Sequence, residues 1–297
     1  MRQDPAGAIG SDRDAVYYCS QDVAAAFCST SRDGGLTFTP AVPIYAANAC
    51  SGLHGHVKVA PDGTVYVPNK ACGGTALGRT AQGIVVSTDN GLTWSVRSDP
   101  PNSRGISDPS VGIGAGDTLY FGYQNGDGHS QVTVSRDRGQ TWSNEQDVGV
   151  AFGIQNTVFS SVVAGDDNGA AFAFLGTPTA GDFQGSTFAG VWHLYVAHTY
   201  DGGVSWTTVD ATPNDPVQRN CIWLGGGSNP CRNLVDFMDT TADQRGRVLV
   251  AYPDGCIDEC VTTTIAPGSS ASIVGYRTKL VTIARQSAGR GVLSAFD

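Results

Sequence analysis

The sequence contains very little lysine and glutamate. Its 297 residues include 18 Lys and Arg and 27 Asp and Glu, yet the only lysines are Lys58, Lys70 and Lys279, and the only glutamates are Glu145 and Glu259. Exposed helix surfaces usually use both residue types, because both are good helix formers. Their scarcity therefore argues against a largely helical protein.

Other absences exclude classes of function. The net charge is −9, which argues against nucleic-acid binding, because that function needs clustered lysine and arginine. No apolar run approaches the roughly 18 residues of a membrane span, and the first ten residues are not a basic and then apolar leader. We therefore expect neither nucleic-acid binding nor a membrane span. If the protein is exported, its signal has been removed or replaced by Met1. The oligomeric state stays open.

The eight cysteines have no CxxC spacing, and the five histidines do not accompany them in metal-ligand order, which disfavours zinc. They lie close together in the sequence as four successive pairs, so we expect local disulfides, although other connectivities are open. Disulfides indicate a secreted, extracellular or periplasmic protein. The expected pairs are Cys19 with Cys28, Cys50 with Cys72, Cys221 with Cys231, and Cys256 with Cys260.

Glycine and aspartate are abundant, and both recur in a short repeat. The motif S/T-x-D-x-G-x-S/T-W/F occurs at residues 31–38, 87–94, 135–142 and 199–206. Aspartate can accept hydrogen bonds from backbone N–H groups, and glycine can adopt the positive φ of a tight turn. Each copy therefore predicts a hairpin turn with a structural role for its aspartate. These aspartates are Asp33, Asp89, Asp137 and Asp201.

A second hairpin precedes each motif. Residues 57–67 and 111–121 share alternating apolar residues around a turn with Asp and Gly. The pattern predicts five units of four strands, beginning near residues 3, 53, 107, 157 and 233. The fifth unit keeps only a degraded motif at 282–293, which lacks the Asp and the Trp.

These repeats resemble the Asp-box, or BNR-repeat, β-propellers of the sialidase-like superfamily. The resemblance implies one all-β domain over residues 1–297, a propeller of four-stranded antiparallel blades. Sialidases of this family have six blades, whereas the spacing here gives five, so a six-bladed ring stays the alternative. In such propellers the ligand binds on the face opposite the Asp boxes. Here that face carries the insertions at 175–190, 207–232 and 253–271 and all four expected disulfides.

Candidate catalytic residues lie where the inner strands begin on this face. Alignment of the turns brings Asp4, His54, Asp108 and Asp236 to similar positions, with Asn156 or Thr157 in the fourth unit. Neighbouring carboxylates raise at least one pKa, which suits general acid/base catalysis. They could equally bind a structural cation such as calcium, or be polar only because the funnel holds water. We expect no other cofactor.

The resemblance to sialidases further implies three arginines that grip a carboxylate, a Tyr nucleophile paired with Glu, and an Asp acid/base. The best candidates are Arg79, Arg104, Arg219, Arg232, Tyr252 and Glu259. The family's Arg-Ile-Pro segment before the first box is absent, so the arginine triad is not assigned.

Trp223 lies in a glycine-rich loop between two cysteines and could stack on a sugar ring or plug the funnel, as could Phe183 and Phe188.

The sequence thus supports two functions. One is a secreted sialidase-like exo-glycosidase acting on extracellular glycans. The other is a propeller that binds glycan or an extracellular protein without catalysis, or a subunit of an extracellular assembly. The scarcity of Glu favours the second.

Overall fold

The computed structural model describes residues 15–21, 25–51, 54–72, 81–97, 100, 103–104, 106–234, 236–264, 266–267 and 276–294, with the backbone alone at 276–279. Within these ranges the chain consists of β-strands, a short 3₁₀ turn η1 (Val150–Phe152) and a four-residue helix α1 (Glu259–Thr262). No helix of this part of the chain is long and apolar enough to cross a membrane. The expectation of an all-β fold is confirmed.

The strands form five antiparallel sheets in the described part of the chain, each built from consecutive strands. The first contains β1 (Val16–Gln21), β2 (Ala26–Ser31) and β3 (Val42–Pro43). The second contains β4 (Lys58–Val59), β5 (Val65–Cys72), β6 (Ala81–Ser87) and β7 (Ser95–Val96). The third contains β8 (Ser110–Ile113), β9 (Leu119–Gln124), β10 (Ser130–Ser135) and β11 (Ser143–Asp147).

The fourth sheet contains β12 (Asn156–Ala164), β13 (Ala170–Thr177), β14 (Val191–Thr199) and β15 (Thr207–Asp210), and β16 (Gln218–Arg219) also pairs with β14. The fifth contains β17 (Asp239–Ala242), β18 (Val248–Cys256) and β19 (Tyr276–Arg285). The inner strands β4, β8, β12 and β17 begin near the expected unit starts, whereas the expected start near residue 3 lies outside the described residues. The number of blades and the domain limits stay predictions.

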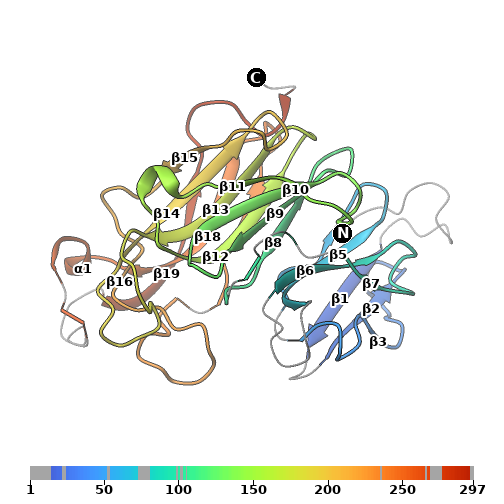
Figure 1. Ribbon diagram of the computed structural model, residues 1–297, viewed down its shortest axis with the longest axis horizontal. Coiled ribbons are helices and arrows are strands. Elements are labelled where there is room, and N and C mark those ends of the chain that lie inside the picture. Colours follow the sequence, from blue (N-terminus) through green and yellow to red (C-terminus); the bar gives the residue numbers. More distant parts are fainter. Residues whose placement is uncertain are drawn as a thin grey trace.

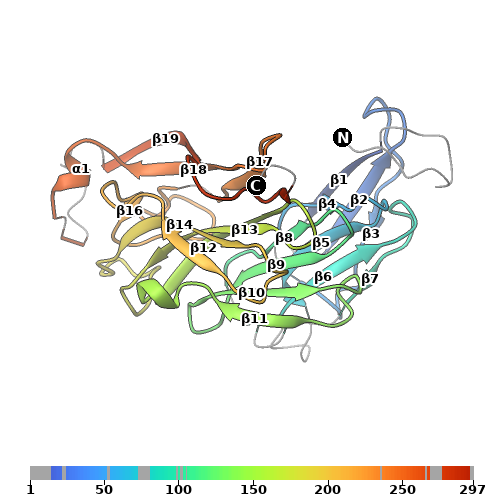
Figure 2. The same ribbon diagram turned by 90° about the horizontal axis from the view of Figure 1, so that it is seen from above.

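Consecutive sheets pack face to face (Figure 1), and they follow one another in chain order from β1–β3 in blue to β17–β19 in orange and red (Figure 2). Each of four apolar clusters of described residues is shared by two successive sheets. Strands β9 and β13 are buried along their whole lengths, because a neighbouring sheet covers each of their faces. At Gly122 a Cβ atom would lie 2.6 Å from Cγ2 of Val162, so only glycine permits this close packing.

The four Asp boxes form hairpin turns at one end of the sheets. The Oδ2 atoms of Asp33, Asp89, Asp137 and Asp201 each accept a hydrogen bond from the hydroxyl four residues on, at 2.5–2.6 Å. The two residues after each aspartate have positive φ, as at Gly202 (75°) and Gly203 (83°). The boxes also join neighbours, since Oγ1 of Thr30 in β2 donates to the carbonyl of Asn90 in the second box at 3.2 Å.

The four disulfides join the pairs that the sequence predicts: Cys19–Cys28, Cys50–Cys72, Cys221–Cys231 and Cys256–Cys260. The first joins directly paired residues of β1 and β2. The last two close loops at the end of the sheets opposite the boxes. These loops therefore have fixed ends on the face where a ligand is expected.

Candidate functional site

A cavity of about 310 Å³ opens where the inner strands of four sheets begin, at the end opposite the Asp boxes. We call it the central cavity. Its walls come from the second sheet, the segment that leads into β8, the middle of β12, and the segment that leads into β17. The side chains that line it include His56, Lys70, Ile106, Asp108, Phe159, Ser160, Arg232, Asp236 and Phe237.

Asp108 faces a cation within this cavity. Its Oδ1 atom lies 3.3 Å from Nζ of Lys70, which extends from β5 of the neighbouring sheet. Burial nonetheless raises the pKa of Asp108 above its ordinary value, against the lowering effect of Lys70, and the nearby Asp236 carboxylate adds to the rise. The cavity thus contains a carboxyl group that holds its proton more firmly than a solvated aspartate does.

Asp236 is held by an arginine from its own segment. Nη2 of Arg232 donates to Oδ2 of Asp236 at 2.6 Å, while Nη1 donates to the carbonyl of Gly225. Among the described lining residues, two cations therefore face two carboxylates, one pair on each side. The lining has no net excess of either charge when His56 is neutral.

The wall contributed by β12 has an irregular backbone. Its pairing with β13 shifts register between Val158 and Ser161, and Phe159 has a φ of 58°, which is rare for an aromatic residue. The hydroxyl of Ser160 is buried without a hydrogen-bond partner among the described residues. Strained backbone and unpaired buried polar atoms are both costly, and both are typical of ligand sites.

The mouth of the cavity has exposed apolar side chains. Ile106 is 51% exposed and Phe237 is 46% exposed. The Phe237 ring lies 5.1 Å from the imidazole of His56, so residues of the second and fifth sheets meet here. An apolar surface beside a few convergent polar groups is the usual composition of a small-molecule site.

The structure brings together only part of the predicted site. Asp108, Asp236 and Arg232 line the central cavity, whereas Asp4 and Arg79 lie outside the described residues. His54 does not line it, and its Nδ1 atom lies 2.9 Å from the carbonyl oxygen of Gly55. It is nevertheless close enough to lower the pKa of Asp108. The lining imidazole is that of His56.

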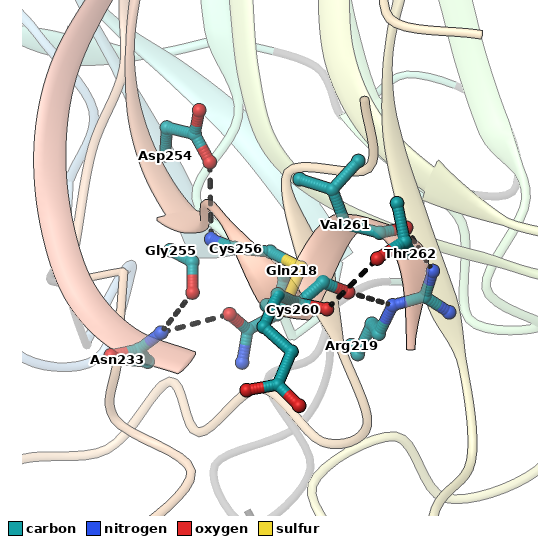
Figure 3. Close-up of a disulfide and its surroundings, with 10 residues drawn as sticks. Gln218, Arg219, Asn233, Asp254, Gly255, Cys256, Cys260, Val261 and Thr262 are labelled. Carbon is teal, nitrogen blue, oxygen red and sulfur yellow. Dashed lines mark hydrogen bonds between the residues drawn. A yellow bond between two sulfur atoms is a disulfide. The ribbon is translucent and has the colours of Figure 1, made fainter. Parts of the chain in front are cut away.

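Arg219 binds the loop that contains Cys260 and Val261 and does not line the central cavity. Its guanidinium donates to the carbonyls of Cys260 and Val261 at 2.7 and 2.8 Å, beside the disulfide between Cys256 and Cys260 (Figure 3). Two of its donors are therefore committed to the backbone of this loop. This arginine does not join the others at the cavity.

The Tyr–Glu couple that the resemblance suggests is not assembled. The Tyr252 side chain is buried in the apolar cluster between the fourth and fifth sheets, where burial raises the pKa of its phenol to about 12. Glu259 is exposed at the start of α1. No hydrogen bond joins the two in the described structure, so they do not form a nucleophile and its partner here.

The remaining aromatic and amide candidates support loops. Nε1 of Trp223 donates to the carbonyl of Gly226 in its own loop at 3.2 Å. Phe183 and Phe188 pack on Trp192 with ring centroids 5.8 and 6.0 Å away, which anchors the insertion between β13 and β14 to the core. Asn156 binds loop carbonyls through its amide, and the Thr157 hydroxyl lies 2.5 Å from that of Ser130.

Sequence reasoning did not select Lys70, Ile106, Ser160 or Phe237 for the site. One signal could have pointed to Lys70, because it is one of only three lysines and falls near the ligand-face end of its strand. Among the residues that the structure describes, no group of three or more His, Cys, Asp or Glu side chains could hold a metal ion.

A family model described as a BNR repeat-like domain matches residues 13–253. No curated protein matches the chain in sequence. Among solved structures, an ulvan lyase of polysaccharide lyase family PL25 is 12% identical with a TM-score of 0.55, over 97% of this chain and 69% of its own.

Two further solved structures are similar. The intramolecular trans-sialidase from Ruminococcus gnavus is 15% identical with a TM-score of 0.45, over 88% of this chain and 50% of its own. A protein of unknown function from Dyadobacter fermentans is 16% identical with a TM-score of 0.46, over 77% of this chain and 64% of its own. The chain thus spans less than two thirds of the length of these two proteins. Because the family match covers most of its length, the chain belongs to the BNR repeat-like domain family, and its antiparallel sheets form a β-propeller.

Proposed function

We propose that the chain is a glycan-acting propeller that holds one sugar unit in the central cavity and hydrolyses its glycosidic bond. The observation that carries the proposal is the meeting of Asp108 and Asp236, from different repeat units, in one cavity on the face opposite the Asp boxes. The unpaired Ser160 hydroxyl supplies a buried polar group for a sugar hydroxyl. The fold shared with a polysaccharide lyase supports a glycan as the ligand.

The two carboxyl groups suit different roles because their surroundings differ. Burial keeps the proton on Asp108 to a higher pH, so Asp108 is the general acid that protonates the departing glycosidic oxygen. Asp236, fixed by Arg232, is the carboxylate that activates water or stabilises the positive charge that develops on the sugar. Phe237 and Ile106 contact the apolar faces of the sugar ring at the mouth.

A panel of aryl glycosides, including sialosides, tests hydrolysis directly. We expect turnover of at least one glycoside, and we expect Asp108→Asn to lower kcat about 100-fold or more, the usual contribution of a general acid. Glu259→Gln, on an exposed helix residue, is the matched control and should retain activity. Failure of the unmodified protein to turn over any glycoside would contradict hydrolysis.

Non-catalytic glycan binding is a second candidate, favoured by the pairing of each lining cation with a carboxylate and by the lack of Tyr and Glu among the described lining residues. A glycan array and calorimetry separate the two functions. Binding without turnover supports this candidate. Neither binding nor turnover contradicts both.

Secretion is supported by the four disulfides, since such bonds persist in oxidising compartments. Thiol labelling of the protein recovered from producing cells tests this. We expect all eight cysteines to resist labelling before reduction. Free thiols in that material would contradict secretion in this oxidised form.

A further inference from the structure

A second cavity of about 590 Å³ opens beside the central cavity on the same face. We call it the side cavity. It lies between the loops of the third and fourth sheets, and its lining includes Arg104, Asn125, Asp127, Gln155, Ala180 and Phe183. Ile106 lines both cavities, so its half-exposed side chain forms the ridge between them.

Buried amide side chains fix both walls of the side cavity. Oε1 of Gln124 accepts the backbone N–H groups of Ile106 and Ser107 at 3.0 and 3.3 Å, which holds the ridge in place. Nδ2 of Asn156 donates to the carbonyls of Thr179 and Gly181 at 2.8 and 3.1 Å, which holds the outer wall. The walls are therefore set before a ligand arrives, which lowers the entropy lost on binding.

The lining chemistry suits a polyhydroxylated ligand. Amide, carboxylate and guanidinium groups around the cavity can donate to and accept from hydroxyls, while Ile106 offers an apolar edge. At Gly181 a Cβ atom would meet nothing within 4 Å, so this wall faces open space. The exposed Arg104 has no carboxylate partner within the described ranges, which leaves its donors for a ligand.

We propose that the side cavity is a second sugar subsite, which binds the unit next to the one in the central cavity, with the linkage crossing Ile106. The ligand class is then an oligosaccharide or polysaccharide rather than a single sugar on a non-carbohydrate group. This inference rests on the proposed function, because it takes the central cavity to be a sugar site.

The test is an array that displays xylose, glucose, galactose, arabinose and rhamnose series, each as the monosaccharide and as its di- to tetrasaccharides. We expect at least tenfold tighter binding of the disaccharide than of the monosaccharide in the preferred series. Ala180→Trp fills the side cavity without touching the central one, and it should remove this gain while leaving monosaccharide binding unchanged. The matched control is Ala288→Trp, at an exposed alanine in the turn after β19, which should retain the gain.

The outcomes separate this inference from the proposed function. Equal binding of monosaccharide and disaccharide, or a gain that survives in Ala180→Trp, overturns the second subsite but leaves the central site intact. Weakened monosaccharide binding in Ala180→Trp also counts against it, because the change would then reach the central cavity. No binding of any displayed sugar overturns this inference, and it overturns the proposed function as well when the unmodified protein also turns over none of the aryl glycosides.

Discussion

Nζ of Lys70 lies 3.3 Å from Oδ1 of Asp108, across the boundary between the second and third sheets. The cation lowers the pKa of Asp108 and so partly offsets the rise caused by burial. Lys70→Met should therefore raise this pKa further, because the opposing cation is removed. If Asp108 is the general acid, its protonated form is the active one. The alkaline limb of the kcat/KM profile should then move to higher pH.

Lys58→Met is the control for this shift, because Lys58 lies 3.7 Å from Asp239 and does not line the central cavity. Carbon-13 NMR titration of the Asp108 carboxyl measures this change in pKa directly and needs no substrate. A lowered or unchanged pKa in Lys70→Met would show that Lys70 does not control the charge of Asp108.

The effects of substituting Arg232 and Asp236 on the free energy of unfolding should not be additive, because the two side chains form an ion pair. Arg232→Gln and Asp236→Asn each break it, so the double variant should be less destabilised than the sum of the single variants. For side chains that are 24% and 42% exposed, we expect a coupling of about 0.5–1 kcal/mol in the free energy of unfolding. Urea denaturation of the four proteins measures it, and additive effects would rule out the coupling.

Asp254 should make the stability of the fifth sheet depend on pH. Burial raises the pKa of Asp254 to about 6 from 3.8, and the nearby Asp215 adds to the rise. Because the folded-state value is the higher one, the stability from this group is full below pH 3.8 and is lost as pH rises through 6. Asp254→Asn keeps an oxygen acceptor for the Cys256 N–H. Because asparagine does not ionise, the variant should not lose stability as pH rises.

We therefore expect Asp254→Asn to be more stable than the unmodified protein at pH 7.5, by about 2 kcal/mol. The advantage should shrink towards pH 4. Unfolding free energies measured across this range test the prediction, and an advantage that does not change with pH would refute the assigned cause.

An Asp box should contribute more to stability than its exposed position suggests. Asp201 accepts hydrogen bonds from the Thr199 hydroxyl at 2.8 Å and from the Ser205 backbone and hydroxyl at 3.0 and 2.6 Å. Asp201→Ala should cost about 2 kcal/mol of unfolding free energy at pH 7, since these donors lose their acceptor. Thermal and urea denaturation measure the loss, with Glu259→Gln as the surface control.

The difference in unfolding free energy between the unmodified protein and Asp201→Ala should become smaller at acidic pH. The hydrogen bonds from Ser205 lower the pKa of Asp201 below 3.8, so its stabilisation is present above that value and is lost as pH falls through the folded-state pKa. A penalty that stays constant down to pH 2 would contradict this account.

The parts of the fold that depend on local sequence were predictable. The Asp boxes could be identified because aspartate, glycine and hydroxyl residues at fixed spacing satisfy one another within a few residues. The disulfide pairs followed from closeness in sequence. The alternation that precedes each box indicated the hairpins there, whereas the unit starts drawn from it stay predictions.

The direction of individual side chains was not predictable in the same way. His54 and His56 lie two residues apart, yet only His56 lines the central cavity, since the backbone is irregular there. Arg219 and Arg232 both lie near the expected face, but Arg219 binds the carbonyls of Cys260 and Val261. Such choices depend on contacts between distant segments, which the spacing of one segment does not encode.

The Asp boxes and the two cavities lie at opposite ends of the same strands. The hydrogen bonds that secure each turn, and the contacts that join a box to the sheet before it, are thus far from the residues that meet a ligand. Loops at the cavity end can change in length and composition without disturbing these turns. Divergence among relatives can therefore alter ligand preference one loop at a time while the repeated turns preserve the scaffold.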